Sequence, residues 1–334
     1  KHKKTKMTKK KKPVSESKMI NSNKKRNIQT VNKNQNTKKY KELEILKDSV
    51  IEIVDKRVVL KFVSSLPFPT HNDLVDELVA IGYYLVKTNK HAEAIIFFKK
   101  LLSLRKDATA AYLAYGSVLA MNRQLEEALE AFDTMIELEE TAYEAYERRA
   151  EVLQAVGRIK EAIADTTYII ENKEGDSNSL VNALVRRGRL LLQEERARSA
   201  RNDLLKALKL LSPNDKINRA VVHNVIGKCE RELGLNDENI ASQKEAIRLN
   251  PSMKDYYLDL AIAHLEISDW QEGLPHLEHA IQIEPRFKLA HGYQALMYQK
   301  LGRSKDALES ISRAIEIHPE PSGMVLKAAS LFSE

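Results

Sequence analysis

The chain has 334 residues, 43% of them hydrophobic, and a net charge of +7. Its longest apolar stretch, near Leu78–Val86, is far shorter than the roughly 20 residues of a membrane-spanning helix, so we expect no membrane contact. A single cysteine, Cys229, excludes an internal disulfide and favours a reducing compartment, nuclear or cytoplasmic. Because the chain begins with Lys1 rather than Met, a targeting signal upstream would not be visible, and an organelle is not excluded.

Residues 1–39 form a basic arm of low complexity. They hold fifteen of the 54 lysines and arginines but one of the 47 acidic residues, Glu16, so the arm carries +14 and the remaining residues −7. The arm has almost no aliphatic or aromatic side chains with which to form a core. We therefore expect it to be disordered in isolation, or held by a partner.

Three roles are open for this arm. It could be a solubilising tail, or a nuclear-import signal formed by Lys9–Lys12 before Pro13. It could also bind an acidic polymer (RNA, DNA or an acidic protein surface), through contacts to the backbone because no aromatic residues lie between the lysines. The residues expected to make those contacts are Lys9, Lys10, Lys11, Lys12, Lys24, Lys25 and Arg26.

Residues 40–72 are predicted to be a capping helix followed by a linker. Apolar side chains at helical spacing indicate a helix over about 41–55, and Pro67 and Pro69 end any helix that follows. The segment either covers the apolar face of the first repeat, or grips a partner.

From residue 73 to 334 one pattern recurs with a period of thirty-four residues. Gly82, Gly116 and Ala150 are spaced by that distance, as are Pro251, Pro285 and Pro319. A fixed period of this length is typical of stacked helix-turn-helix units, each of which buries its apolar face against its neighbours. In the first unit the small Gly82 and Ala94 would let two helices approach closely, with Phe98 filling the volume behind them; Gly116, Ala128 and Phe132 repeat this arrangement.

These small residues, the aromatic on the second helix and the closing proline resemble the tetratricopeptide repeat. The resemblance implies an all-α solenoid of about seven repeats, wound as a right-handed superhelix. The stretch from Tyr146 to Leu153, with Gly157, Arg158 and Ala162, is also similar to the family of tetratricopeptide repeat protein 13 and its plant immune-suppressor relatives.

The array is irregular in its middle. The steps from Ala150 to Gly188 and from Gly188 to Gly227 are thirty-eight and thirty-nine residues, with insertions at Asn172–Asn178 and near Pro213. The fifth repeat has Asn239 where alanine is usual and Gln243 where an aromatic residue is expected, so we expect weak packing and a deformable joint around residues 229–244.

In this family the first helices line a groove that holds peptides or helices, and the resemblance implies the same here. The candidate groove residues are apolar in repeats one and two, basic in repeats four and five, and aromatic in repeat seven: Val79, Tyr83, Leu113, Ser117, Arg186, Arg189, Asn224, Lys228, Arg231 and Tyr293. The basic cluster could instead be an ordinary solvated face. The lysines and asparagines with which some members bind chaperone tails are absent, so a chaperone-tail adaptor is disfavoured.

Motifs for catalysis are lacking. The sequence has no phosphate-binding loop, dinucleotide glycine pattern, zinc-spaced cysteines or nucleophile elbow. We therefore predict no enzyme activity, no cofactor and no metal, and interpret Cys229 as a packing residue.

Three functions remain open from the sequence. The leading hypothesis is a scaffold whose groove holds a protein partner while the arm contacts an acidic polymer, as part of a larger assembly. The alternatives are a structural component of a large ribonucleoprotein particle, and a nuclear regulatory adaptor with the arm as its import signal.

Overall fold

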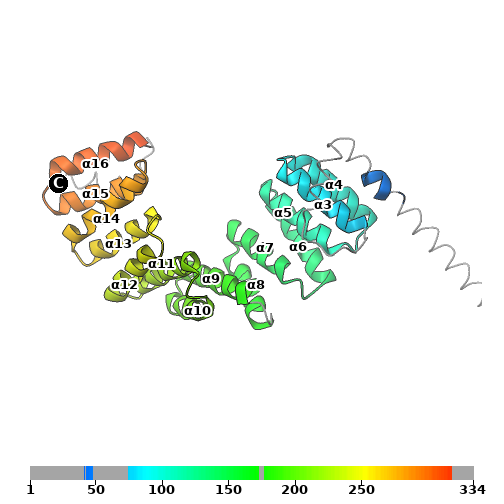
Figure 1. Ribbon diagram of the computed structural model, residues 1–334, viewed down its shortest axis with the longest axis horizontal. Helices are drawn as coiled ribbons and strands as arrows, with labels where there is room; N and C mark the ends of the chain where they lie inside the picture. Colours follow the sequence, from blue (N-terminus) through cyan, green and yellow to red (C-terminus); the bar gives the residue numbers. More distant parts are fainter. Residues whose placement is uncertain (1–40, 42, 48–73, 173–176, 318–334) are drawn as a thin grey trace, which may run out of the picture. The chain divides into compact units, whose positions relative to one another are not determined.

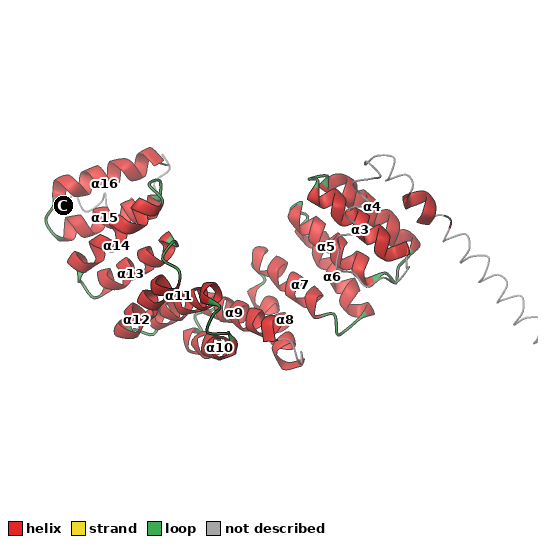
Figure 2. Ribbon diagram, in the orientation of Figure 1, coloured by secondary structure: helices red, strands yellow, loops and turns green. Residues whose placement is uncertain are grey.

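The computed structural model describes residues 41, 43–47, 74–172 and 177–317, and every regular element in these ranges is an α-helix (Figure 1, Figure 2). The helices follow one another as pairs joined by short turns. The first three pairs are α3 (Leu74–Lys87) and α4 (His91–Leu104), α5 (Thr109–Met121) and α6 (Leu125–Leu138), and α7 (Tyr143–Ala155) and α8 (Ile159–Asn172). The next four are α9 (Ser177–Gln193) and α10 (Ala197–Leu210), α11 (Lys216–Glu232) and α12 (Asn236–Leu249), α13 (Lys254–Glu266) and α14 (Trp270–Ile283), and α15 (Lys288–Lys300) and α16 (Ser304–Ile317). Residues 74–317 thus hold seven helix-turn-helix repeats, which confirms the predicted fold class.

One residue in each turn within a repeat has a left-handed backbone conformation. In three repeats it is glycine, and in four it is another residue, with φ between 58° and 83°: Gly157, Gly234, Gly302, Asn89, Arg123, Glu195 and Ser268. Such a residue just past a helix ends it by turning the chain back over the last carbonyls. Side chains other than glycine tolerate this conformation at a cost of about 1 kcal/mol, so the turn recurs more regularly than glycine does.

The chain divides into two compact units, residues Lys1–Glu139 (unit 1) and Glu140–Glu334 (unit 2). In unit 1 the core lies between α3, α4 and α5, around the fully buried Leu78, Phe98 and Leu101. Leu43 packs into this core, and Lys47 Nζ lies 2.6 Å from Glu77 Oε2 of α3. Residues 41 and 43–47 of the predicted capping helix are therefore helical and cover the first repeat, while the rest of residues 40–72 lies outside the described residues.

Close helix approach at the small residues is confirmed. A Cβ atom added to Gly116 would lie 2.6 Å from Cε1 of Phe132, and Gly82 faces Phe98 in the same way. The partner in each case lies sixteen residues further along the chain. Thr166 occupies the same place in the third repeat, where its hydroxyl donates to the Ala162 and Ile163 carbonyls, and Leu204 occupies it opposite Gly188.

The expectation of weak packing in the fifth repeat is wrong for the pair α11–α12. Gln243 is 1% exposed and is hydrogen-bonded on both ends of its amide. Asn224 Nδ2 donates to Gln243 Oε1 at 2.8 Å, and Gln243 Nε2 donates to the Asn224 carbonyl at 3.2 Å and to Asn239 Oδ1 at 3.4 Å. Polar residues replace the usual apolar ones without loss of packing because they satisfy one another.

Candidate partner-binding groove

The first helices of the repeats in unit 2 lie next to one another. α9 contacts α11, α11 contacts α13, and α13 contacts α15. In unit 1, α3 contacts α5 in the same way. A ligand lying across the first helices would therefore meet side chains from successive repeats.

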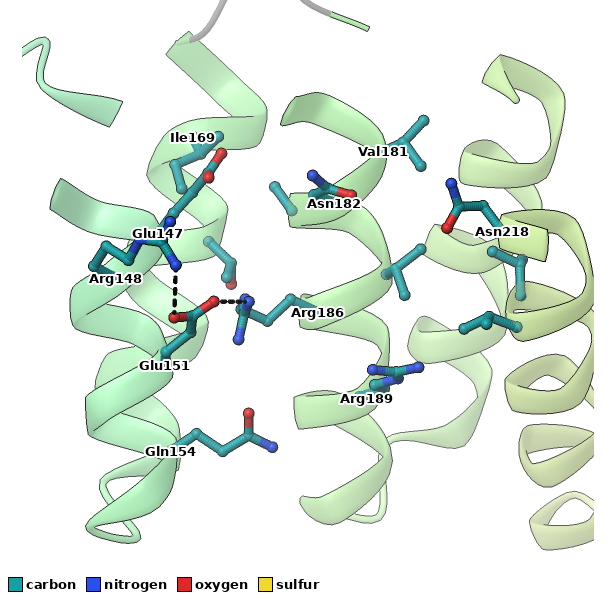
Figure 3. Close-up of a pocket in the computed structure, with 15 residues that line it drawn as sticks. Glu147, Arg148, Glu151, Gln154, Ile169, Val181, Asn182, Arg186, Arg189 and Asn218 are labelled. Carbon is teal, nitrogen blue, oxygen red and sulfur yellow. Dashed lines mark hydrogen bonds and ion pairs between the residues drawn. The ribbon is translucent and has the colours of Figure 1, made fainter. Parts of the chain in front are cut away.

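A groove of about 460 Å³ lies in unit 2 between α7, α9 and α11 (Figure 3). Its apolar lining comes from Ile169, Val181, Val185, Val221 and Val222. Its polar lining comes from Glu147, Arg148, Glu151, Gln154, Asn182, Arg186, Arg189 and Asn218. A groove with apolar walls and a few polar groups is suited to a segment of polypeptide, because the walls bind side chains and the polar groups fix position.

The polar side chains of α7 form hydrogen bonds with one another and with side chains of α9. Glu151 accepts hydrogen bonds from Arg148 Nη1 at 3.4 Å and from Arg186 Nη2 at 2.6 Å (Figure 3). Glu147 accepts from the Ser179 hydroxyl at 2.7 Å. These bonds hold the two first helices in register and leave the groove wall largely neutral.

Arg189 differs from the other cations of the groove because no carboxylate among the described residues pairs with it (Figure 3). Its side chain is exposed. It lies one helical turn from Arg186, on the same face of α9. Desolvation by the surrounding groove, followed by the charge of Arg186, lowers the pKa of Arg189 from its ordinary value. An anion bound to this guanidinium would offset both effects, because a nearby negative charge favours the charged form of arginine.

The remaining residues of the predicted basic cluster are held by acidic neighbours. Lys228 Nζ lies 3.0 Å from Asp259 Oδ2, and Asn224 Nδ2 donates to the same oxygen at 2.7 Å. Arg231 pairs with Glu232 at 3.3 Å and approaches Glu266 at 3.7 Å. The cluster is thus a series of ion pairs between successive first helices, and Arg189 is its exception.

The other predicted groove residues lie on the first helices but differ in exposure. In unit 1, Val79 is 2% exposed and belongs to the core, whereas Tyr83, Leu113 and Ser117 are half-buried. The Ser117 hydroxyl donates to the Leu113 carbonyl of its own helix. Tyr293 of α15 is half-buried, and burial raises its pKa. The predicted contacts of the arm, Lys9–Lys12, Lys24, Lys25 and Arg26, lie outside the described residues.

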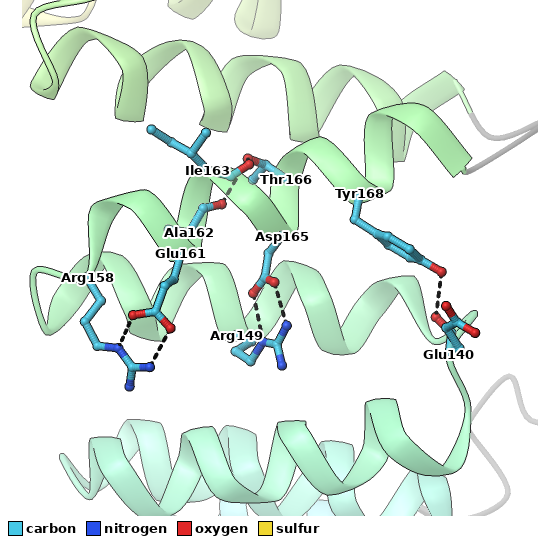
Figure 4. Close-up of polar contacts among 9 residues, drawn as sticks. All are labelled: Glu140, Arg149, Arg158, Glu161, Ala162, Ile163, Asp165, Thr166 and Tyr168. Atoms are coloured by element: carbon cyan, nitrogen blue, oxygen red, sulfur yellow. Dashed lines mark hydrogen bonds and ion pairs between the residues drawn. The ribbon is translucent and has the colours of Figure 1, made fainter.

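The structure adds two buried ion pairs that sequence reasoning missed. Arg149 Nε and Nη2 donate to Asp165 at 2.9 and 2.6 Å (Figure 4), and Arg187 Nε and Nη2 donate to Asp203 at 2.7 and 2.9 Å. Each pair joins the two helices of one repeat. Both partners recur after thirty-eight residues, the step between the third and fourth repeats, and this recurrence was a signal available in the sequence.

Cys229 is fully buried, which confirms its interpretation as a packing residue. Burial, together with the charge of Glu230, raises the pKa of its thiol to about 12. The described residues contain no group of three or more side chains suited to bind a metal ion. Within the same residues, helices long and apolar enough to span a membrane are lacking.

Comparison with known protein families finds one match, over part of the chain. The tetratricopeptide repeat family matches residues 79–145 and 258–320. No curated protein matches the chain in sequence. None of these comparisons supports the finer resemblance to tetratricopeptide repeat protein 13.

Solved structures share the fold at low identity. A tetratricopeptide repeat protein from Parabacteroides merdae has 17% identity and a TM-score of 0.62, over 78% of this chain and 99% of that one. The C-terminal part of a repeat protein from Cytophaga hutchinsonii has 17% identity and a TM-score of 0.55, over 75% and 98%. The Cut9–Hcn1 hetero-tetramer of the APC/C has 19% identity and a TM-score of 0.55, over 76% of this chain and 48% of that one. At these identities the likeness establishes the fold alone.

Proposed function

We propose that this protein is a non-catalytic scaffold, and that its groove between α7, α9 and α11 holds a segment of a partner protein. Its resemblance to tetratricopeptide repeat proteins supports this function. The observation that supports this most is the groove itself, which joins apolar walls from Val181, Val185 and Val221 to a rim of polar side chains. Its volume of about 460 Å³ accommodates a few residues of an extended segment or one turn of a helix. The Arg186–Glu151 ion pair and the hydrogen bond from Ser179 to Glu147 fix the shape of the groove before a partner arrives, which lowers the entropy lost on binding.

Site-specific photocrosslinking tests this function. A photoreactive amino acid at Asn182, which lines the groove, is compared with one at Lys206, which is exposed on α10 outside the groove. After irradiation in cells, we expect one partner segment to be crosslinked from residue 182 but not from residue 206, as mapped by mass spectrometry. Equal crosslinking at both positions, or none at residue 182, would refute the groove as the partner site.

We also propose that the chain works within a larger assembly. Cut9–Hcn1, whose solved structure shares this fold, is a hetero-tetramer of the APC/C. Size-exclusion chromatography of cell extract at moderate salt would show the full chain eluting well above its own mass of 38.1 kDa. Elution at the mass of the single chain would contradict this proposal.

The basic arm, residues 1–39, supports a second and separate proposal, contact with an acidic polymer. It rests on the charge of +14 within these residues. If roughly eight of its lysines and arginines engage a structured nucleic acid, binding should weaken with a log–log salt slope of about −5 to −7.

Deletion of residues 1–39 separates this role from its alternatives. Loss of association with RNA or a particle at moderate salt supports polymer binding, including a place in a ribonucleoprotein particle. Unchanged association with lost nuclear entry supports the nuclear adaptor instead, with Lys9–Lys12 as the import signal.

A further inference from the structure

We propose that the partner segment held in the groove carries a carboxylate, from Asp, Glu or a chain terminus, and that Arg189 binds it. This inference rests on the proposed function, because it names the chemistry of the segment that the same groove would hold. It concerns one contact within the groove.

The charge of the groove supports an anionic ligand. Three guanidinium groups line it, those of Arg148, Arg186 and Arg189, against the two carboxylates of Glu147 and Glu151. Arg148 and Arg186 both donate to Glu151. The positive charge that is left is the one on Arg189, which no acidic side chain among the described residues contacts.

The surroundings of Arg189 suit a carboxylate that is part of a peptide. Asn182 lies on the same helix with its side chain exposed to the groove, and Val185 and Val221 provide apolar wall beside it. Asn182 can bond to the peptide backbone, while the valines accept a small apolar side chain next to the acidic one. A guanidinium can donate two parallel N–H groups to the two carboxylate oxygens. Such a bidentate contact is strong and also fixes the orientation of the carboxylate.

Tyr256, in the sixth repeat, acts on the charge of Arg189 but is itself neutral. Tyr256 of α13 is 4% exposed, and its hydroxyl has no hydrogen-bond partner among the described residues. It interacts electrostatically with Arg189, and burial raises its pKa, so it stays protonated. Because it is neutral, Tyr256 does not supply the negative charge that Arg189 lacks.

The same groove disfavours phosphate and nucleic acid. A phosphate group carries close to two negative charges, and Glu147 and Glu151 lie within the same groove. A single unpaired guanidinium balances one charge. A carboxylate thus fits where a dianion or a polyanion would be repelled by the acidic side chains of α7.

Selection from a displayed peptide library tests the inference on the full chain. The unmodified protein, Arg189→Glu and Arg198→Glu are each used to enrich random twelve-residue peptides. Arg198 is the matched control because it is exposed in the same repeat but lies on α10, outside the groove. Circular dichroism of each variant confirms that the helices are retained.

We expect the unmodified protein and Arg198→Glu to enrich peptides with Asp or Glu at one fixed position. Arg189→Glu should bind the selected peptide at least tenfold more weakly, on the order expected for losing a charged hydrogen bond. Replacing the acidic residue of the peptide by Lys should restore binding to Arg189→Glu in part. Arg189→Gln should also bind the acidic peptide more weakly, which excludes simple charge repulsion as the cause.

Failure of this inference differs from failure of the proposed function. Enrichment of peptides without an acidic position, or equal binding to Arg189→Glu, overturns the carboxylate contact and leaves the groove as a peptide site. Tighter binding when phosphoserine replaces the acidic residue, lost in Arg189→Glu, overturns the carboxylate in favour of phosphate. If the unmodified protein enriches no peptide, the proposed function is overturned, and the inference with it.

Discussion

Gly116 lets the ring of Phe132 lie directly against the backbone of α5. A methyl group at this position would come within 2.6 Å of the ring, and Phe132 is fully buried, so the ring cannot move aside without disturbing the core. Alanine favours a helix by about 1 kcal/mol over glycine, but overpacking a core costs about 1–3 kcal/mol. We expect Gly116→Ala to lower the free energy of unfolding by about 1 kcal/mol in urea titrations followed by circular dichroism.

The double variant Gly116→Ala, Phe132→Leu is the control for this interpretation. The smaller leucine makes room for the added methyl group, so the double variant should lose less stability than the two single effects added together. Strict additivity of the two substitutions would show that the ring and the added methyl group do not collide.

His276 of α14 should make unit 2 sensitive to acid. Desolvation, followed by the nearby charges of His264, Lys244 and His279, lowers its pKa from 6.5 to about 4. In the unfolded chain His276 takes up a proton near pH 6.5, whereas in the folded chain it stays neutral until about pH 4. Protonation therefore favours unfolding, and the stability present above pH 6.5 falls as the pH drops towards 4, by about 2–3 kcal/mol at most.

Comparison of the unmodified protein with His276→Asn isolates this effect from the titration of carboxylates. We expect the melting temperatures of the two proteins to converge as the pH falls from 7 to 4, because only the unmodified protein loses the contribution of this imidazole. A constant difference in melting temperature across that range would contradict the assignment to His276.

The buried ion pair of Arg187 with Asp203 joins the two helices of the fourth repeat. Asp203 is 5% exposed and accepts two hydrogen bonds from the guanidinium, so removing its charge leaves a mostly buried cation without its carboxylate. We expect Asp203→Asn to cost about 3 kcal/mol of unfolding free energy in urea titrations. The exposed pair Arg158–Glu161 is the matched control, and Glu161→Gln should cause little change.

Replacing both Arg187 and Asp203 shows whether the loss of stability comes from an unpaired buried charge or from the loss of the contact itself. With Arg187→Met and Asp203→Leu together, no charge remains to be desolvated, and apolar packing should recover most of the stability. A double variant as unstable as Asp203→Asn would show that the pair acts through its geometry and not through its charge.

The sequence predicted the helices and their closest contacts because these depend on local pattern. Gly82, Gly116 and their phenylalanines recur at a fixed spacing, and each pair meets within one helix pair. The turns were less visible because glycine occupies the left-handed position in three of the seven repeats described between residues 74 and 317.

The charge of the groove face was harder to predict, because its basic side chains pair with carboxylates on the first helices of neighbouring repeats. Arg186 pairs with Glu151, and Arg231 with Glu266, each partner thirty-five residues away on a neighbouring first helix. A reading of the basic residues alone therefore overstated the positive charge of this face. The polar network of Asn224, Asn239 and Gln243 was missed because its members, taken one at a time, look like poor core residues, whereas they satisfy one another within a single repeat.

At the scale of the whole chain, each unit holds a core of its own. The core of unit 1 surrounds Leu78 and Phe98, and those of unit 2 include the clusters around Leu204 and Leu277. All fifteen residues that line the groove belong to unit 2. In an array of repeats stability comes from contacts between neighbours, so a unit with complete repeats should fold without the other.

We therefore expect residues 140–334, produced alone, to be helical by circular dichroism and to unfold cooperatively on heating. This fragment keeps α7, with the Arg149–Asp165 pair and the Glu151–Arg186 contact. A fragment of residues 159–334 is the control: it loses α7, exposes the buried Ala162 and Ile169 of α8, and leaves Asp165 without its arginine. That shorter fragment should aggregate or melt at a lower temperature, because a terminal repeat that is cut in half uncovers its apolar face. Equal melting temperatures for the two fragments, or a disordered longer fragment, would contradict the assignment of a self-sufficient unit beginning at Glu140.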